Sequence, residues 1–289
     1  MVRPSSAPSG VEHPQQAGDL TDRQFNLISV LVKDLCGINL HEGKRELVRA
    51  RLVKRLRELR IGSFAQYIDL IRSREGEVEI LAMLDALSTN LTFFFRENDH
   101  FELLRQKAGP QMLERHADDR RIRIWSAGCS SGEEPYSIAI VMQQVLAGRG
   151  GFDVKILATD LSRRMLEIAR HGIYSHERFR DTPPRTIAEN FVCLQSQPHR
   201  RYQVEQSLRQ MVTFARLNLM EAWPMRGPFD AIFCRNVMIY FDKPTQNRLV
   251  ERLWDLLAPG GMLFIGHSES LSGVQHRFQY VQPTAYRKP

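Results

Sequence analysis

The stretch Ile124-Trp-Ser-Ala-Gly-Cys-Ser-Ser-Gly-Glu-Glu-Pro-Tyr136 decides the fold class of this 289-residue chain. Its apolar run up to Ser126 is typical of a buried strand, and the residues after Gly132 favour a helix. Gly128 and Gly132 fit a turn between the two, because glycine tolerates positive φ and keeps side chains away from a ligand. A strand, a glycine turn and a helix N-terminus form the geometry in which a nucleotide-like cofactor lies on exposed backbone amides.

Two acidic residues at the start of the helix narrow the choice of cofactor. Glu133 and Glu134 suit the helix dipole, but they would repel a diphosphate. S-adenosylmethionine has no phosphate and carries a sulfonium and an amine, so it fits better. The Gly-x-x-x-Gly spacing is weak alone, since an ordinary strand-to-helix loop shows it about as often.

Composition sets the broad class of the protein. The chain is 43% hydrophobic and carries a formal charge of +7, which favours a globular protein with an acidic partner: nucleic acid, an anionic membrane surface or an acidic protein. Its four cysteines show no metal-binding spacing, so we expect a reduced, cytoplasmic protein without a metal site. Residues 1–18 are rich in Pro, Ser, Gln and Gly and predict a disordered leader, and no segment is long enough to span a bilayer.

The patterning predicts two domains, a helical one with its linker over residues 19–106 and an α/β one over residues 107–289. Thr21 and Gln24 have the spacing of a capping box. The first helix should stop near Gly37. Further helices are expected at residues 43–60, 64–73 and 77–87.

The second part alternates short strand-like runs with helical stretches, which indicates βαβ units and a mainly parallel sheet. The expected strands are 122–126, 154–159, 211–215, 229–234 and 262–266, with a terminal run near 278–286. Ala258-Pro-Gly-Gly261 should form a break before the fifth strand, and a final hairpin strand would make the sheet mixed. Residues 185–210 look like a small inserted subdomain, although a surface loop is an alternative.

Polar residues follow two of these strands at the sheet edge where open α/β proteins bind ligands. Asp160 is placed to bond a ribose, and its alternative role is to cap the helix that starts at Arg163. Arg235, Asn236 and Tyr240 follow the strand at 229–234. Each also has an ordinary structural explanation: Arg235 could form a surface ion pair, Asn236 could sit in a turn, and Tyr240 could pack in the core.

The domain junction, residues 88–101, has hydrogen-bonding side chains followed by three phenylalanines and Arg96. We expect this segment to fold back against the sheet edge and close the cofactor site, although the aromatics could be interdomain core alone.

Four segments in the same order resemble the signature motifs of the CheR-type chemotaxis receptor glutamate O-methyltransferases. They are residues 90–96, 132–137, 229–242 and 266–269, and the resemblance covers roughly residues 20–287. It implies an α/β class I S-adenosylmethionine-dependent methyltransferase: a Rossmann-like, mainly parallel sheet with a terminal antiparallel strand, a small all-helical domain before it and an inserted β-subdomain. The product besides the glutamyl methyl ester would be S-adenosylhomocysteine.

The resemblance also implies site residues. Arg96 and Tyr240 would lie near the departing methyl group as catalytic residues. The cofactor would be surrounded by Asn90, Thr92, Arg96, Glu134, Asp160, Asn218, Leu219, Arg235 and Asn236, with Gly128 added from the glycine turn.

A basic helix offers a substrate face. Residues 44–60 place Val48, Leu52, Leu56 and Leu59 on one stripe and Lys44, Arg51, Lys54, Arg55 and Arg57 opposite it. The resemblance makes the cytoplasmic helical domains of methyl-accepting chemotaxis receptors the expected partner, while a solvated charged face is the default. We expect a monomer that neither binds nucleic acid nor inserts into membranes.

Other functions remain open at this stage. A nicotinamide dehydrogenase usually has Gly-x-Gly-x-x-Gly and an acid closer than Asp160. A nucleic-acid methyltransferase would explain the charge, but no RNA-binding motif is evident; a non-catalytic S-adenosylmethionine sensor is a third reading. The inserted subdomain of the family can grip a receptor C-terminal peptide, yet the loop at 195–199 lacks glycine, so we expect weak or no dependence on such a peptide.

Overall fold

The computed structural model describes residues 19–196 and 198–289. Residues 19–30 and 41–87 form one compact unit, and residues 31–40 and 88–289 form another. The expected leader, 1–18, and Gln197 of the 195–199 loop lie outside the described residues. Within the described part, no helix is long and apolar enough to cross a membrane.

The helical unit has the elements that the sequence predicts. Its helices are α1 (Asp22–Cys36, whose C-terminal part belongs to the second unit), α2 (Arg45–Leu59), α3 (Phe64–Arg72) and α4 (Glu77–Leu87), with 3-10 turns at Glu42–Lys44 and Arg74–Gly76. The capping box at the start of α1 is confirmed: Gln24 N donates to Thr21 Oγ1, and Thr21 N donates to Gln24 Oε1.

Helix α2 buries Val48, Leu52 and Leu56, as its apolar spacing predicts. Leu59, expected on the same stripe, is 37% exposed because α2 ends there and the next residue, Arg60, turns into the left-handed region. The buried stripe is therefore one turn shorter than the sequence pattern.

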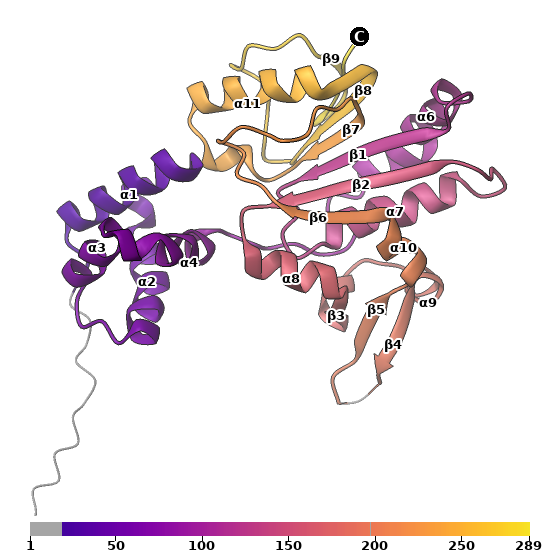
Figure 1. Cartoon of the computed structure of the whole chain (residues 1–289). Coiled ribbons are helices and arrows are strands. Elements are labelled where there is room, and N and C mark those ends of the chain that lie inside the picture. The colour runs from indigo at the N-terminus through magenta and orange to yellow at the C-terminus, as the bar shows by residue number, and fades with distance from the viewer. Residues whose placement is uncertain (1–18, 197) are drawn as a thin grey trace, which may run out of the picture. The chain divides into compact units, whose positions relative to one another are not determined.

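The second unit contains a seven-stranded sheet in the order β6-β2-β1-β7-β8-β10-β9 (Figure 1). The strands are β1 (Arg121–Ala127), β2 (Asp153–Asp160), β6 (Val212–Arg216), β7 (Phe229–Cys234), β8 (Leu257–Ile265), β9 (Gln279–Gln282) and β10 (Ala285–Arg287). β6, β2, β1, β7 and β8 pair in parallel, and β10 is antiparallel to both β8 and β9. The predicted mixed, mainly parallel sheet with a terminal antiparallel strand is confirmed.

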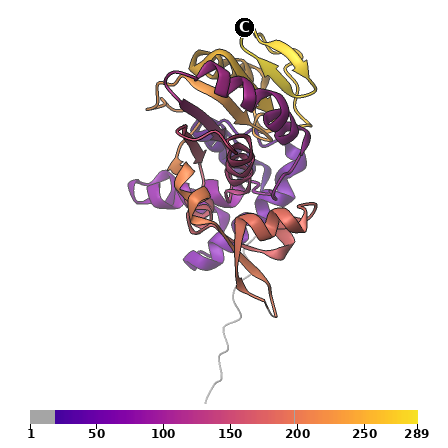
Figure 2. The same cartoon turned by 90° about the vertical axis from the view of Figure 1, so that its right-hand side faces the viewer.

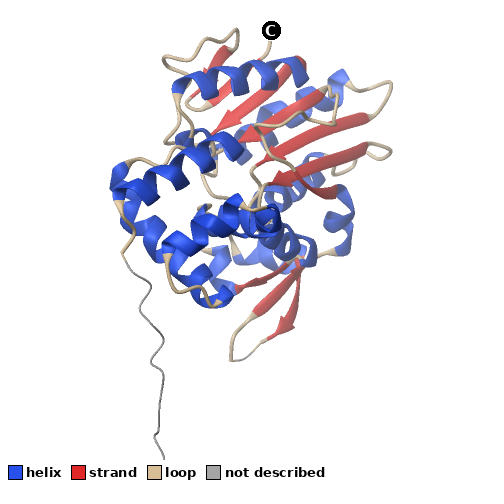
Figure 3. Cartoon of the chain, turned by 60° about the vertical axis from the view of Figure 1, so that its left-hand side comes forward, coloured by secondary structure: helices blue, strands red, loops and turns tan. Residues whose placement is uncertain are grey.

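Helices cover both faces of this sheet (Figure 3). Ile122 and Ile124 of β1 belong to a core with α7 (Glu133–Val145), whereas Trp125 and Ala127 belong to a second core with α11 (Lys243–Leu256). The change of face between neighbouring residues follows from the two-residue period of a strand. α8 (Arg163–His171) also packs on β2 and β6.

A second, three-stranded antiparallel sheet, β3-β5-β4, projects beyond the main one (Figure 2). Its strands are β3 (Ile173–Ser175), β4 (Phe191–Gln195) and β5 (Arg201–Val204), with a 3-10 turn at His176–Phe179 and the helices α9 (Pro184–Asn190) and α10 (Gln206–Met211). The inserted subdomain is thus a sheet, and it starts earlier than residue 185 because β3 supplies one edge. Before β1 come α5 (Asp99–Leu103), a π-helical turn at Leu104–Ala108 and α6 (Gly109–Arg115).

The Ala258–Gly261 segment differs from the prediction. It lies inside β8 rather than before it, and the register between β7 and β8 shifts there. The backbone N–H of Gly260 donates to Lys288 O, and Lys288 N donates to Gly261 O. Pairing with the C-terminal end of the chain therefore holds a sequence of turn-forming residues in a strand.

Candidate active site

A cavity opens at the carboxyl ends of β1 and β7, where the order of the parallel strands reverses. Ligands of open α/β sheets bind at such a switch point. Three segments form its wall: the junction before α5, the glycine loop after β1 and the residues that follow β7. The lining residues are Thr89, Asn90, Leu91, Thr92, Phe93, Arg96, Phe101, Gly128, Cys129, Ser130, Glu134, Arg235, Asn236, Ile239 and Tyr240.

The junction lines the cavity, as expected from its hydrogen-bonding and aromatic residues. Its three phenylalanines have separate environments: Phe93 lines the cavity, Phe94 is buried, and Phe95 packs edge-on against Phe101. Phe95 N also donates to Ser137 Oγ of α7 at 3.0 Å. The segment is therefore held against the sheet and serves as both cavity wall and core.

The two glycines of the decisive stretch have positive φ, +81° at Gly128 and +96° at Gly132. A Cβ at Gly128 would lie 2.5 Å from Val237 Cγ2, so the loop also needs glycine for packing. The sequence predicts that backbone amides of this loop face the cofactor, but the N–H groups of Gly128 and Cys129 both donate to Thr159 O of β2. Gly128 and Cys129 therefore line the cavity, while their amides anchor the loop to β2.

Asp160 does not cap α8. Ser162 is the N-cap, since its side chain accepts from Met165 N, and Asp160 Oδ1 accepts from Ser162 N at 2.9 Å. Its Oδ2 accepts from Ser130 N at 2.7 Å. Asp160 thus holds the glycine loop from β2, beside the cavity rather than in its lining.

Arg235 connects the three segments of the cavity wall. Its side chain is 2% exposed, with Nη1 2.9 Å from Glu134 Oε2 and Nη2 2.9 Å from Glu97 Oε2; it also donates to Arg96 O. Burial raises the pKa of Glu134, and Arg235 opposes that rise. Ser126 Oγ donates to the other oxygen of Glu134 at 2.7 Å, so this acid at the start of α7 is fixed from two sides.

Glu97 is a residue that the sequence reasoning missed, although it directly follows Arg96. Besides Arg235, it accepts from Asn236 Nδ2 at 3.2 Å and from His267 N at 3.1 Å. Burial would raise the pKa of Glu97, but Arg235 and Asn236 outweigh burial and leave that pKa lowered. Glu97 is an ionised anchor for the polar tip of β7.

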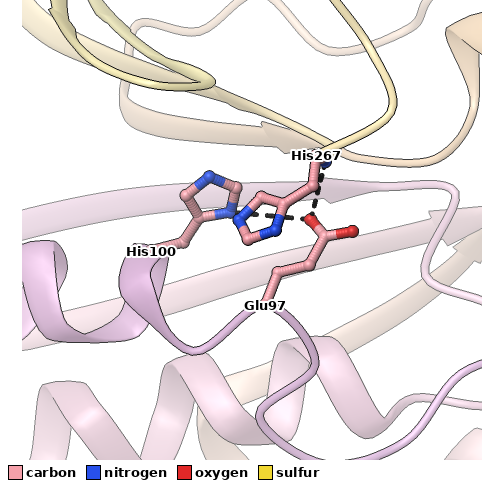
Figure 4. A group of neighbouring side chains, drawn as sticks. All are labelled: Glu97, His100 and His267. Atoms are coloured by element: carbon pink, nitrogen blue, oxygen red, sulfur yellow. Dashed lines mark hydrogen bonds and ion pairs between the residues drawn. The ribbon is translucent and has the colours of Figure 1, made fainter.

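Glu97, His100 and His267 come together with their possible ligand atoms within 4.8 Å of one another (Figure 4). The Arg235 guanidinium already occupies Glu97 Oε2, and a divalent cation there would face this positive charge at close range. We therefore interpret the group as the surroundings of Glu97, which pairs with Arg235.

Glu269, in the fourth motif, is a second missed anchor. Its carboxylate is buried and accepts from the backbone N–H groups of Gly266, Asn236, Val237 and Ile239. Asn236 has a φ of +59°, so the cradle holds the turn after β7 in an uncommon conformation. Burial raises the pKa of Glu269, and the backbone donors oppose that rise.

Arg96 and Tyr240 line the cavity together with two exposed apolar residues, Leu91 and Ile239. The Arg96 side chain is 28% exposed; Nη1 donates to Leu91 O at 2.7 Å, and Nη2 donates to Asn236 Oδ1. Its position is thus fixed by backbone and amide oxygens.

Besides Asp160, two of the predicted cofactor residues lie outside this lining. Asn218 is buried, and its amide donates to Leu35 O at 2.6 Å and to Glu221 Oε1 at 3.0 Å. Leu219 lines a separate pocket with residues of α11. The structure brings together Asn90, Thr92, Arg96, Gly128, Glu134, Arg235 and Asn236 from the predicted set.

The predicted substrate face of α2 is divided. Lys54 and Arg57 are exposed, whereas Arg51 Nη1 donates to Leu87 O. Arg55 Nη2 lies 2.6 Å from Glu79 Oε2, and Tyr67 donates to Glu79 Oε1 at 2.7 Å. Lys44 is half-buried. Arg55 therefore belongs to the internal polar network of the helical unit.

The lining suits S-adenosylmethionine. Arg235 Nε is buried without a hydrogen-bond partner, so a donor is available for the ligand's carboxylate. Glu134 places a carboxylate in the lining, and Phe93 and Phe101 add apolar surface. The mixed sheet and its switch-point cavity define a class I S-adenosylmethionine-dependent methyltransferase.

Comparison with known proteins gives the family. Residues 23–88 match the "CheR methyltransferase, all-alpha domain", and residues 90–287 match the "CheR methyltransferase, SAM binding domain". The chain belongs to the CheR methyltransferase family, which confirms the resemblance, and its cofactor is S-adenosylmethionine.

Curated relatives match over nearly their whole length. Chemotaxis protein methyltransferase 2 of Pseudomonas aeruginosa is 45% identical over 287 residues, covering 98% of this chain and 99% of the relative. The chemotaxis protein methyltransferase of Escherichia coli is 42% identical over 268 residues, covering 92% and 91%. A probable chemotaxis protein methyltransferase of Rhizobium etli is 44% identical over 252 residues, covering 87% and 94%.

Proposed function

We propose that this protein methylates glutamate side chains in the cytoplasmic helical domains of chemoreceptors, forming glutamyl methyl esters during chemotactic adaptation. The names of the relatives support the chemotaxis role. The observation that carries the choice of acceptor is the cavity lining: among its described residues there is neither His nor Lys, and Glu134 is paired with Arg235. A carboxylate acceptor needs no base, because it is ionised at neutral pH.

The reaction then depends on alignment. When bound, S-adenosylmethionine supplies a methyl group on a positively charged sulfur. Arg96, fixed by Leu91 O and Asn236 Oδ1, can hold the acceptor carboxylate by a charge-assisted hydrogen bond. Tyr240 can orient the same carboxylate, so that one oxygen keeps its lone pair for attack.

Cofactor placement is part of this proposal. Asn90, Thr92, Gly128, Glu134, Arg235 and Asn236 would contact S-adenosylmethionine, and Asp160 would do so from beside the lining. Asn218 and Leu219 lie outside the lining and would contact it from the segment that follows β6.

The substrate face is a separate part of the proposal. Lys54 and Arg57 would attract an acidic receptor helix, while Arg51 and Arg55 of α2 have partners within the helical unit. We also propose a cytoplasmic monomer.

The test is transfer of labelled methyl from S-adenosylmethionine to a purified chemoreceptor cytoplasmic domain. RNA and a receptor with its acceptor glutamates changed to alanine serve as controls. Base-labile label on the intact receptor alone is expected. Label on RNA, or on the alanine receptor, would overturn the proposal.

Arg96→Ala and Tyr240→Phe test the catalytic roles. Both variants should lose turnover; Tyr240→Phe should keep its affinity for S-adenosylhomocysteine, whereas Arg96→Ala should also bind it more weakly, because Arg96 is a predicted cofactor residue too. Near-normal turnover in both would refute the assignment.

A further inference from the structure

The inserted three-stranded sheet and the turn after β3 contact two of the three segments that form the cavity wall, the glycine loop and the junction. Tyr174 of β3 donates its hydroxyl to Ser131 O of the glycine loop at 2.7 Å. Arg178, in the 3-10 turn after β3, donates from Nη1 to Thr92 O of the junction at 2.9 Å. Phe94 N donates in return to Arg178 O at 3.0 Å. Hydrogen bonds therefore join the inserted subdomain to the glycine loop and to the junction.

An aromatic cluster fixes the position of this contact. The Phe94 ring stacks on Phe179 with centroids 4.9 Å apart and an interplanar angle of 5°. It also packs edge-on against Tyr174 and Phe191, both at 5.0 Å. Phe179 directly follows Arg178, so the packing that holds Phe94 also limits where the Arg178 guanidinium can lie.

A buried acid aims at the same guanidinium. Glu133, at the start of α7, is 0% exposed, and Ser131 Oγ donates to its Oε2 at 2.7 Å. Its Oε1 has no hydrogen-bond partner, and Arg178 Nη1 lies 3.4 Å from it. A carboxylate in this position needs a nearby cation. Arg178 thus joins the start of α7 to the junction.

We propose that Arg178, backed by Glu133, is a positioning residue for S-adenosylmethionine. By holding Thr92 O, it keeps Asn90, Thr92 and Phe93 in the cavity wall. The inserted sheet is accordingly a structural part of the cofactor site, although none of its strands lines the cavity. This inference rests on the proposed placement of the cofactor along the junction.

The test compares Arg178→Gln and Arg178→Lys with a matched control, Arg185→Gln. Arg185 lies in the same subdomain; its side chain is 88% exposed and, among the described residues, forms an ion pair with Glu189 alone. Arg178→Gln should weaken S-adenosylhomocysteine binding, measured by calorimetry, about tenfold, because a charge-assisted bond to Thr92 O is lost. Arg178→Lys should recover part of this loss, and Arg185→Gln should match the wild type.

Kinetics separate positioning from simple destabilisation. Arg178→Gln should raise the KM for S-adenosylmethionine about tenfold and leave kcat at saturating cofactor within about twofold. A lower kcat with unchanged KM and cofactor affinity would mean a smaller folded fraction and would overturn the inference. Glu133→Gln keeps the shape of the side chain and serves as the second variant if Arg178→Gln folds poorly. It should also raise the KM for S-adenosylmethionine.

A wrong placement of the cofactor and a wrong role for Arg178 give different results. Asn90→Ala and Thr92→Ala should weaken S-adenosylhomocysteine binding if the ligand lies along the junction. If neither does, the placement is wrong. If both do and Arg178→Gln binds like the wild type, the placement stands and the role of Arg178 is refuted.

Discussion

His100 should make the protein lose stability as the pH falls below neutrality. The ring is 0% exposed, and its Nε2 lies 2.7 Å from Thr284 Oγ1. Since the Thr284 hydroxyl donates to Pro283 O, it accepts from His100 Nε2–H; Nδ1 has no hydrogen-bond partner, and the nearest carboxylate oxygen, Glu97 Oε2, lies 4.0 Å from it. Burial and the nearby Arg235 lower the pKa of His100 from 6.5 to about 3.

The sign and size follow from proton linkage. A lowered folded-state pKa means that the unfolded chain takes up the proton first, so stability is full above pH 6.5 and falls as the pH drops toward 3. The slope is about 1.4 kcal/mol per pH unit in this window, which amounts to about 2 kcal/mol lost between pH 7 and pH 5.

The assay is urea unfolding of the wild type, His100→Gln and His276→Gln between pH 7.5 and pH 5. Gln cannot titrate and can still donate to Thr284, so the His100 variant should show a shallower pH dependence by about 2 kcal/mol at pH 5. His276 is exposed, and its variant should follow the wild type. Parallel curves for the wild type and His100→Gln would show that His100 is not held neutral in the fold and would refute the reasoning.

Three further predictions concern the cavity wall and the substrate face. Glu97→Gln should raise the Kd for S-adenosylhomocysteine about tenfold, because Arg235 loses one ionised partner; an unchanged Kd by calorimetry would contradict this. Gly132→Ala should cost about 3 kcal/mol in urea unfolding, since φ is +96° and Ala169 Cβ lies 2.8 Å from the added Cβ; Gly148→Ala, with positive φ but open space, should cost about 1 kcal/mol, and equal costs would exclude the clash. Lys54→Glu with Arg57→Glu should raise the KM for receptor about tenfold without changing cofactor affinity. The matched control, Arg72→Glu with Arg74→Glu, reverses two exposed charges of the same unit and should leave that KM unchanged; equal effects of the two pairs would assign the change to net charge.

Local signals were sufficient for most of the fold. The capping box at Thr21, the apolar period of α2 and the glycine break after β1 each act over a few residues, and each predicts its element within a few positions. The prediction for the Ala258–Gly261 segment was wrong because its strand conformation depends on Lys288, which pairs with it in the sheet but lies near the C-terminal end of the chain. Residues with turn propensity follow such pairing when a neighbouring strand supplies the hydrogen bonds.

The site was harder to predict, because its anchors act across long sequence separations. Arg235 was expected at the sheet edge, but its contact with Glu97 spans 138 residues, and no periodicity marks such a pair. Glu97 and Glu269 both lie in or beside motifs that the sequence singles out, so proximity to a motif was the available signal. The family resemblance placed Asn218 near the cofactor; its amide donates to Leu35 O, and its contact with the cofactor stays a prediction.

The Arg235 side chain holds together the segments that form the cavity wall. A lysine has a single ammonium and could not reach Glu134, Glu97 and the Arg96 carbonyl at once, whereas the guanidinium does so in a fixed fork. Loss of the guanidinium would leave two carboxylates that are only 11% and 12% exposed without their shared cation; for a buried pair such a loss costs about 3–5 kcal/mol. The start of α7, the junction and the tail of β7 are separate in sequence and meet at this ion pair, so the same contacts that stabilise the sheet edge also shape the cofactor cavity.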